Sequence, residues 1–268
     1  MRRIINAHCH IYPEVIAERA VQGIGDFYGI KLDLNGTTED LIRDGSGSGV
    51  VHYLVHSVAT KPYQVRTINS FIASEVKDHP GLFTGFGTLH PDSEDLKGDL
   101  KYIISLGLKG VKIHPDCQGF SLDEDKAIRL GQLVRDAGLP LLTHCGDFRF
   151  SRSNPDQFRV FLDKLPDLKV IGAHLGGWSV WDEVSQKIAG KYDIYVDCCS
   201  CLRFMEPGKA AALIRKFGVD KVLWGTDYPA WGHAEELKLF DGLELTDEER
   251  EKILYTNAAK LLNIEENG

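Results

Sequence analysis

Two histidines stand two residues apart near the start of the chain, in the stretch NAHCH at positions 6–10. The residues before them are short, apolar and β-branched, and Pro13 follows, which indicates a strand that ends here. Because successive side chains of a strand point to opposite faces, His8 and His10 share one face. Two imidazoles on one face at a strand end suit a metal ion, although ordinary hydrogen bonding would explain the pair equally well.

Three further polar residues stand at the ends of strand-like segments later in the chain. His144 follows the segment PLLT, His174 follows VIGA, and Asp227 follows VLWGT. In a parallel barrel every strand brings its carboxyl end to the same rim, so residues far apart in sequence meet there. Five polar residues at strand ends therefore predict one shared site, whereas each residue alone could simply cap a strand or bond a loop.

The chemistry expected from this set is that of a divalent metal ion. Neutral imidazoles with a carboxylate suit zinc or another borderline divalent metal, and a catalytic site leaves one position open for water. A bound ion brings the pKa of that water toward ~7. A carboxylate beside it can take up the water proton and later return it to a leaving group. We therefore predict one Zn²⁺ per chain, with another divalent metal as the alternative.

Strand-like and helix-like segments alternate along the chain and would position these residues. Three of the predicted helices begin with proline, which the first turn of a helix tolerates. The connection between the first two strands is the longest, and its helical content is the least clear. The predicted strands are residues 4–10, 50–57, 83–89, 107–114, 140–145, 169–174, 193–198 and 221–227; the predicted helices are residues 62–78, 93–106, 122–137, 155–165, 178–189, 207–217 and 247–262.

This alternation predicts parallel strands joined by right-handed crossovers. Eight such units in 268 residues fit a (β/α)8 TIM barrel of the α/β class, as a single domain over residues 1–268. An open doubly wound sheet would more plausibly carry a glycine-rich phosphate turn after its first strand. The sequence there is HIYP, with no GxGxxG pattern, so the barrel is the predicted fold.

The composition argues against several classes of function. A net charge of −8 and a pI of about 5.7 argue against a nucleic-acid-binding surface. No apolar run approaches the ~18 residues of a membrane helix, and the run behind the basic start is too short for a signal peptide. We expect a cytoplasmic protein that binds a small molecule, with a homodimer as its assembly. Its six cysteines are expected to be reduced, and the run CCSC at 198–201 lacks the paired CxxC elements of a structural zinc site.

The set of strand-end residues resembles the metal site of the amidohydrolase superfamily. The closer likeness is to its amidohydrolase-related branch, which includes aminocarboxymuconate semialdehyde decarboxylase and related decarboxylases and hydrolases. The resemblance implies that His8, His10 and His144 are the main metal ligands. It also implies that Asp227 both contacts the metal and moves the proton, while His174 ligates weakly or orients the water. The likeness covers essentially the whole chain and includes the segments GVKIHP (110–115), AHLGG (173–177), GTDYP (225–229) and NAAKLL (257–262).

Other strand-end residues are expected to bind substrate or to support the site. In the fourth predicted strand, Lys112 and His114 should face the barrel axis, and we assign both to substrate binding. Lys112 could instead be carboxylated and bridge two metals, as in binuclear members of the superfamily, but a charged residue paired at the rim or bound to a substrate carboxylate is favoured. His56 and His90 are expected to be substrate or supporting groups rather than ligands, and plain hydrogen-bonded residues would explain them equally well.

Loops at the same rim supply cations and an aromatic ring. Arg149 and Arg152 follow the fifth predicted strand, and Trp178 follows the sixth. They suggest an anionic substrate with an apolar part, although solvated arginines and a packed tryptophan would look the same in sequence. The predicted function is a metal-dependent hydrolase that cleaves a C–N or C–O bond of a small carboxylated amide or lactone. The alternative is a nonoxidative decarboxylase on the same metal site, and the sequence discriminates poorly between them.

Overall fold

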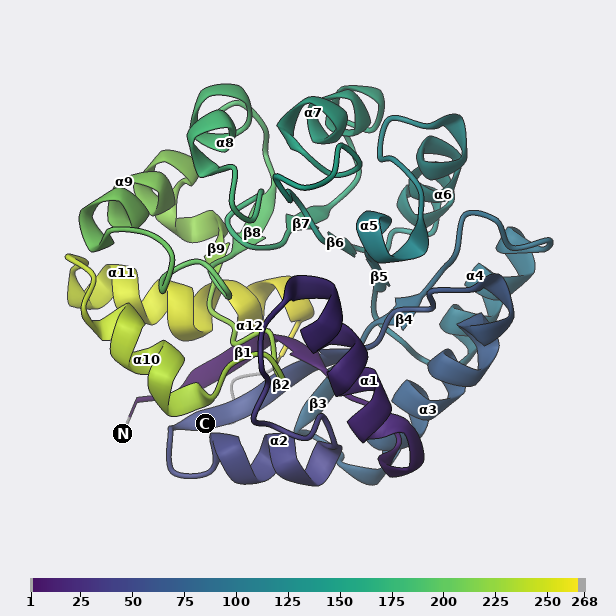
Figure 1. The fold of residues 1–268 in the computed structure, drawn as a ribbon, viewed down its shortest axis with the longest axis horizontal. Helices are drawn as coiled ribbons and strands as arrows, with labels where there is room; N and C mark the ends of the chain where they lie inside the picture. The colour runs from purple at the N-terminus through teal and green to yellow at the C-terminus, as the bar shows by residue number, and fades with distance from the viewer. Residues whose placement is uncertain (1, 265–268) are drawn as a thin grey trace.

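The strands of the computed structural model, which describes residues 2–264, are short, buried and parallel. They follow one another around the molecule in chain order, in a group of three and a group of six (Figure 1). The first group is β1 (Ile4–His10), β2 (Val50–His56) and β3 (Phe83–Gly85); the second is β4 (Gly87–Thr88), β5 (Val111–Ile113), β6 (Leu141–Thr143), β7 (Val170–Gly172), β8 (Tyr195–Asp197) and β9 (Val222–Leu223).

Hydrogen bonds at two seams close these groups into one barrel. Between β2 and the β3–β4 junction, the N–H of Phe86 donates to the carbonyl of Val55 at 3.0 Å. Between the last and first strands, the N–H of Ala7 donates to the carbonyl of Trp224 at 2.9 Å, and His10 donates to Tyr228 at 2.7 Å. The predicted (β/α)8 barrel is therefore confirmed, with β3 and β4 together in place of the third predicted strand.

Phe86 lies where the third predicted strand is interrupted, between β3 and β4. Its ring is fully buried and belongs to a core cluster with Ile5, Leu54 and Leu142, which come from strands on different sides of the barrel. A Cβ atom on Gly110 would lie 2.5 Å from this ring, so the neighbouring strand has room for Phe86 only because position 110 is glycine.

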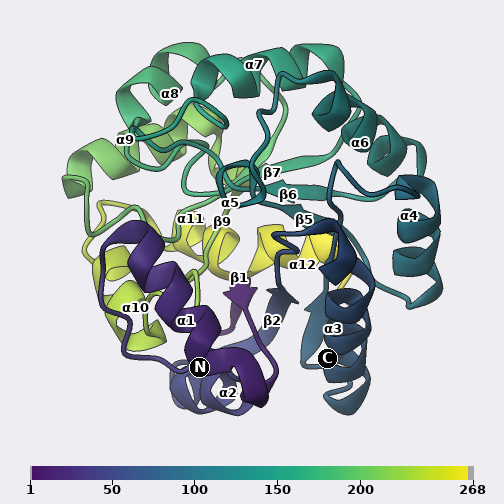
Figure 2. The ribbon, with the colours of Figure 1, turned by 45° about the vertical axis from the view of Figure 1, so that its right-hand side comes forward.

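Helices form an outer layer around the strands (Figures 1 and 2) and largely match the predicted segments. The predicted helix 247–262 differs, because a π-helical turn (Lys252–Thr256) separates α11 (Asp247–Glu251) from α12 (Asn257–Leu262). Within residues 2–264, no helix has the length and apolarity needed to cross a membrane. The outer helices are α3 (Val65–Asp78), α4 (Leu96–Ser105), α6 (Asp125–Asp136), α7 (Pro155–Lys164), α8 (Trp181–Lys187) and α9 (Pro207–Phe217).

Three helices that bear on the site were not predicted. The long β1–β2 connection contains α1 (Glu14–Tyr28) and α2 (Thr38–Gly45), and α10 (His233–Asp241) follows β9. At the end of α1, the Tyr28 hydroxyl lies 3.0 Å from Nε2 of His114, which follows β5. The helix α1 therefore reaches across the carboxyl ends of the strands, where the predicted site lies (Figure 1).

Candidate metal centre

Three of the predicted ligands converge at the carboxyl end of β1. The Nε2 atoms of His8 and His10 are 3.2 Å apart, and Oδ1 of Asp227 lies 3.3 Å from the first and 3.6 Å from the second. Two ligand atoms about 2.1 Å from a tetrahedral ion lie about 3.4 Å from each other. The three atoms thus have the mutual spacing of ligands that share one metal ion.

The pKa values of the imidazoles favour the form that binds a metal. Burial lowers the pKa of His8 well below its ordinary value, and the ammonium of Lys112 lowers it further, while Asp227 acts in the opposite direction. Burial also lowers the pKa of His144 well below its ordinary value. These rings are uncharged at neutral pH, and an uncharged imidazole keeps a lone pair for a metal ion.

Asp197, the last residue of β8, binds the ring nitrogen of His8 that faces away from His10. Its Oδ2 accepts a hydrogen bond from Nδ1 of His8 at 2.8 Å, and both side chains are completely buried. Its Oδ1 accepts from the backbone N–H of His174 at 3.0 Å and from the thiol of Cys199 at 2.8 Å. A proton held on Nδ1 leaves the lone pair of His8 on Nε2, the atom that faces His10 and Asp227.

Replacement of Asp197 by asparagine is expected to weaken metal affinity by ~10–100-fold, because the amide can offer an N–H to Nδ1 and favour the wrong tautomer of His8. The affinity is measured by titrating the metal-free protein with Zn²⁺ or Mn²⁺ against a competing chelator, with the thermal midpoint as a check of folding. Asp193→Asn is the matched control, because that carboxylate is exposed and paired with Lys221. Equal affinities in the two variants would contradict this role for Asp197.

His144 and His174 meet beside the first group with their lone pairs facing each other. Nε2 of His144 lies 2.8 Å from the carbonyl oxygen of Gly146, and Nδ1 of His174 lies 3.2 Å from that of Cys199. Because carbonyl oxygens only accept, each of these nitrogens carries the ring proton. The remaining nitrogens, Nδ1 of His144 and Nε2 of His174, are 3.0 Å apart and lack a proton between them. Two such atoms repel unless a cation lies beside them.

His144 and His174 lie beside the group formed by His8, His10 and Asp227. The ring of His174 stacks on that of His8 with 5.4 Å between centroids, so His174 connects the two groups. Among the described residues, His8 belongs to two groups whose ligand atoms lie within 4.8 Å of one another, the first with His10 and His56 and the second with Cys199 and Asp227. Neither of these includes His144, so ligation of the same ion by His144 stays a prediction.

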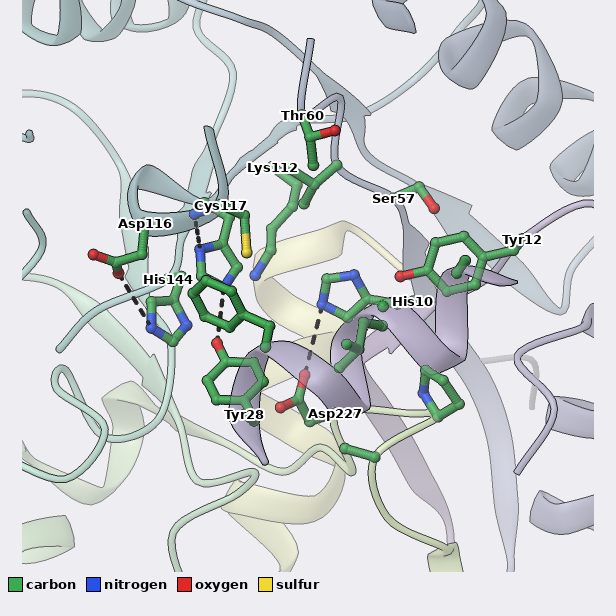
Figure 3. A pocket seen from close by; sticks show the side chains of 18 of the residues that line it. His10, Tyr12, Tyr28, Ser57, Thr60, Lys112, Asp116, Cys117, His144 and Asp227 are labelled. Atoms are coloured by element: carbon green, nitrogen blue, oxygen red, sulfur yellow. Dashed lines mark hydrogen bonds and ion pairs between the residues drawn. The ribbon is translucent and has the colours of Figure 1, made fainter. Parts of the chain in front are cut away.

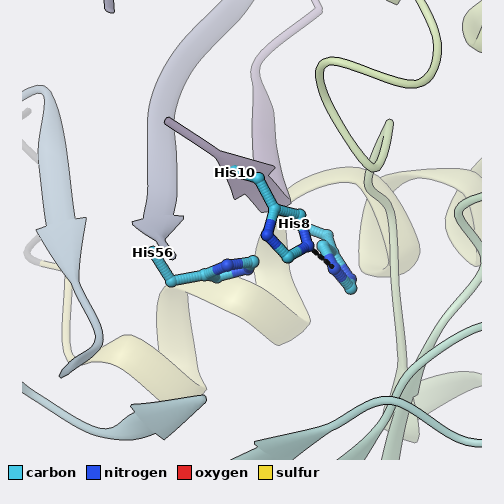
Figure 4. A group of neighbouring side chains, drawn as sticks. All are labelled: His8, His10 and His56. Carbon is cyan, nitrogen blue, oxygen red and sulfur yellow. Dashed lines mark hydrogen bonds between the residues drawn. The ribbon is translucent and has the colours of Figure 1, made fainter. Parts of the chain in front are cut away.

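His56, at the end of β2, lies against the β1 pair (Figure 4). Its ring is fully buried and meets the ring of His10 edge to face, with 4.4 Å between centroids. Among the described residues, neither of its nitrogens has a hydrogen-bond partner. Leaving a buried polar atom unpaired costs ~1–3 kcal/mol, so the imidazole fits a site whose missing partner is an ion or a ligand.

Lys112 and His114 line the same cavity, which has a volume of about 750 Å³ (Figure 3). Lys112 is completely buried, and its Nζ donates to Nε2 of His8 at 3.2 Å. Burial lowers the pKa of the Lys112 ammonium, whereas the carboxylates of Asp227 and Asp197 raise it. The ring of His114 stacks on His144 at 3.9 Å, and Trp178 also lines the cavity.

The two predicted substrate arginines are engaged elsewhere. The guanidinium of Arg149 forms paired hydrogen bonds to the buried carboxylate of Asp147 and donates to the carbonyl of Phe27 at 2.6 Å. Arg152 donates to the backbone carbonyl of Asp116 at 3.0 Å. Neither residue lines the cavity, and substrate binding by them stays a prediction. They fasten the loop after β6 to α1 and to α5 (Pro115–Gln118).

The backbone is strained at the residues that carry the site. His174, Ser200 and Asp227 have φ angles of +60°, +55° and +56°, in the left-handed region. Such conformations cost of the order of 1–3 kcal/mol each and persist where surrounding contacts enforce them. Here the hydroxyl of Ser200 donates to Oδ2 of Asp227 at 2.7 Å, and Nε1 of Trp231 donates to Ser200 at 2.8 Å. These contacts hold Oδ1 of Asp227 toward His8 and His10.

Known proteins share both the sequence pattern and this barrel. The chain matches the family described as Amidohydrolase over residues 5–264. It belongs to the amidohydrolase family. The 2-amino-3-carboxymuconate-6-semialdehyde decarboxylase of Dictyostelium discoideum is 22% identical over 240 residues, a match that covers 75% of this chain. The match spans 66% of that relative, just under two thirds of its length.

Solved structures show the same fold over nearly the whole of this amidohydrolase. A dihydroxybenzoic acid decarboxylase from Polaromonas, solved with manganese and 2-nitroresorcinol, has a TM-score of 0.74 at 17% identity and covers 98% of each chain. A protein from Acinetobacter baumannii described as a probable 2-pyrone-4,6-dicarboxylic acid hydrolase has a TM-score of 0.70 at 14% identity, covering 97% of this chain and 99% of that one. The fold therefore serves both decarboxylases and hydrolases, and at least one such protein holds a divalent metal.

The structure also identifies supporting residues that the sequence reasoning missed. Asp197 stood at a predicted strand end like Asp227, so its position was a usable signal. No feature of the sequence pointed to Asn6. Its Oδ1 accepts hydrogen bonds from the backbone N–H groups of His8 and Thr226, each at 3.2 Å. This amide holds β1 in register with the segment that carries Asp227.

Proposed function

We propose that this amidohydrolase is a divalent-metal enzyme that decarboxylates a small unsaturated or aromatic carboxylic acid without oxidation. The metal proposal is carried by one observation, the convergence of unprotonated imidazole nitrogens. Nδ1 of His144 and Nε2 of His174 face each other, and Nε2 of His8 also keeps its lone pair, because the opposite nitrogen of each ring is bound to an acceptor. Nδ1 of His144 and Nε2 of His174 need a cation as their partner, while Nε2 of His8 accepts from the ammonium of Lys112 at 3.2 Å.

His8, His10 and Asp227 would hold the ion through Nε2, Nε2 and Oδ1, and His144 and His174 are its further candidate ligands. Nitrogen and oxygen donors fit zinc, and manganese is the alternative that the related decarboxylase from Polaromonas supports. A divalent ion bound here would act as a Lewis acid on a substrate oxygen.

The cavity supports decarboxylation over hydrolysis. Beyond the metal ligands and Lys112, its wall is composed largely of aliphatic and aromatic side chains, which suit the body of an unsaturated acid. The buried ammonium of Lys112 would bind the carboxylate of such an acid. The C–C bond to the leaving carboxylate breaks with loss of CO₂, and the electron pair left on carbon takes a proton from Asp227, which regains one from solvent.

Hydrolysis is the second candidate, and the position of Asp227 suits it as well. The Oδ1 atom lies beside His8 and His10, where it could equally take a proton from an attacking water and return it to a leaving group. A lactone or amide that carries a carboxylate would place that group on Lys112. The two reactions thus use the same residues. They differ in that hydrolysis consumes a water molecule, whereas decarboxylation releases CO₂.

Elemental analysis and a product screen test the proposal. We expect about one divalent metal per chain, and CO₂ release from some of a panel of hydroxybenzoates and unsaturated dicarboxylates. Absence of metal after purification without chelators and attempted reconstitution would refute the metal centre. Opening of lactones or amides without CO₂ release would select hydrolysis. A reproducible two metals per chain would instead indicate that Lys112 is carboxylated and bridges them.

A further inference from the structure

The 750 Å³ cavity extends well beyond the metal centre. From Lys112 and Asp227 it continues between α1 and the segment formed by the 3₁₀ turn η1 (Pro62–Gln64) and α3. We propose that this outer wall is a binding site for an apolar arm of the substrate, an aryl ring or a branched alkyl chain. The inference rests on the proposed function, because the carboxylate end of the same molecule would lie at Lys112 and the metal.

The helix α1 presents two apolar stripes, one buried and one that lines the cavity. Ala17, Val21 and Gly25 form the buried stripe. A second stripe consists of residues spaced by three or four positions, which places them on one side of the helix. This stripe lines the cavity; its members are Ile16, Ala20, Ile24 and Phe27. At the end of this stripe Phe27 also stacks on Phe150, with 5.6 Å between ring centroids, whereas Ile16 at its start is 47% exposed.

The opposite wall is apolar as well. Ile68 and Phe71 of α3 line the cavity, with Tyr63 of η1 at its edge. Ile16, Tyr63 and Phe204 line it although they are 47%, 82% and 51% exposed, respectively. Large apolar side chains gathered around an opening are typical of a surface that a ligand covers. Polar side chains are also present on the wall, namely Arg19, Thr60, Gln64 and Thr67.

The volume sets the size of the expected ligand. An apolar cavity of about 150 Å³ is enough to bind benzene, so a single carboxylated ring would leave most of the 750 Å³ unfilled. The wall of α1 runs from Phe27, whose ring lies 6.3 Å from that of His114, to the exposed Ile16. An acid whose ring carries a second ring or a branched chain would fill this part of the cavity and remove the exposed apolar side chains from water.

Binding of two simple acids to the metal-loaded protein tests the inference. Isothermal titration should show that biphenyl-4-carboxylate binds at least ~10-fold more tightly than benzoate, because its second ring is buried on α1. Ile16→Ser should remove most of this difference. Val15→Ser is the matched control, since Val15 is the preceding residue, is 91% exposed and does not line the cavity. Phe204→Ser and Phe148→Ser form a second such pair, because only Phe204 lines the cavity.

Each outcome bears on one proposal. Equal affinities for the two acids, or equal losses in the Ile16 and Val15 variants, would overturn the apolar site even if the protein releases CO₂ from smaller acids. The expected affinities without turnover of any acid, lactone or amide would instead contradict the proposed function alone. If neither acid binds, the assignment of the carboxylate to Lys112 and the metal is wrong, and biphenyl-4-methanol then probes the apolar wall by itself. Absence of binding by this alcohol overturns the inference. Binding that Ile16→Ser weakens supports it.

Discussion

Replacement of Asp227 by asparagine is expected to lower kcat by at least ~10²-fold, the effect typical of a lost general acid–base group. The amide keeps the size and polarity of the side chain, and Ser200 can still donate to its oxygen, but it cannot accept and release the catalytic proton. The loss should appear in kcat rather than only in KM, because the missing interaction belongs to the chemical step. The assay uses the substrate found in the product screen, at a metal concentration that saturates the variant.

Metal content and thermal midpoint must be measured on the same preparation, because Oδ1 of Asp227 also lies within 3.3 Å of His8 Nε2. The imidazoles of His8, His10 and His144 are expected to retain substantial metal in the Asp227→Asn variant. Asp220→Asn is the matched control, since this carboxylate is exposed, pairs with Lys252 and is remote from the cavity. Full metal content with nearly unchanged turnover would show that Asp227 is not the proton carrier, and His174 would become the next candidate.

Removal of a proposed metal ligand is expected to have the second large effect. His10→Ala and His144→Ala should each lose most of the bound metal, more than the ~10–100-fold reduction in affinity expected of the supporting Asp197. Both side chains lie at the rim, where they contribute little to the core, so the barrel should stay folded. The measurement is metal per chain after dialysis, together with the circular dichroism spectrum and thermal midpoint.

The two variants distinguish the parts of the metal centre. His10 belongs to the group of atoms spaced like ligands of one ion, whereas Nδ1 of His144 faces His174. His79→Ala is the control, because His79 bonds the backbone of α3 and lies outside the cavity. Loss of metal from the His10 variant alone would leave His144 as a substrate-binding or positioning residue. Retention of metal by both variants would contradict the site.

Much of the site was predictable because it depends on local periodicity and on one property of parallel barrels. Alternation along a strand places His8 and His10 on the same face. The common direction of all the strands brings the residues that end them to one rim, so Asp227 could be expected beside His8 from more than 200 positions away. The same reasoning placed Lys112 and His114 in the cavity.

The tertiary structure alone decided which of these groups are engaged and which are free. Arg149 is held by Asp147 two residues away, a pairing that depends on the fold of its loop, and so it does not reach the cavity. His8 and Asp197 bond across 189 positions of sequence, and that contact selects the nitrogen that faces the metal centre. The second apolar stripe of α1 could be recognised as a cavity wall only once its first stripe was seen to be buried. The physical reason is that a strand's period is a property of the backbone, whereas a ring's tautomer, an ion pair and a cavity wall depend on neighbours that long-range packing brings together.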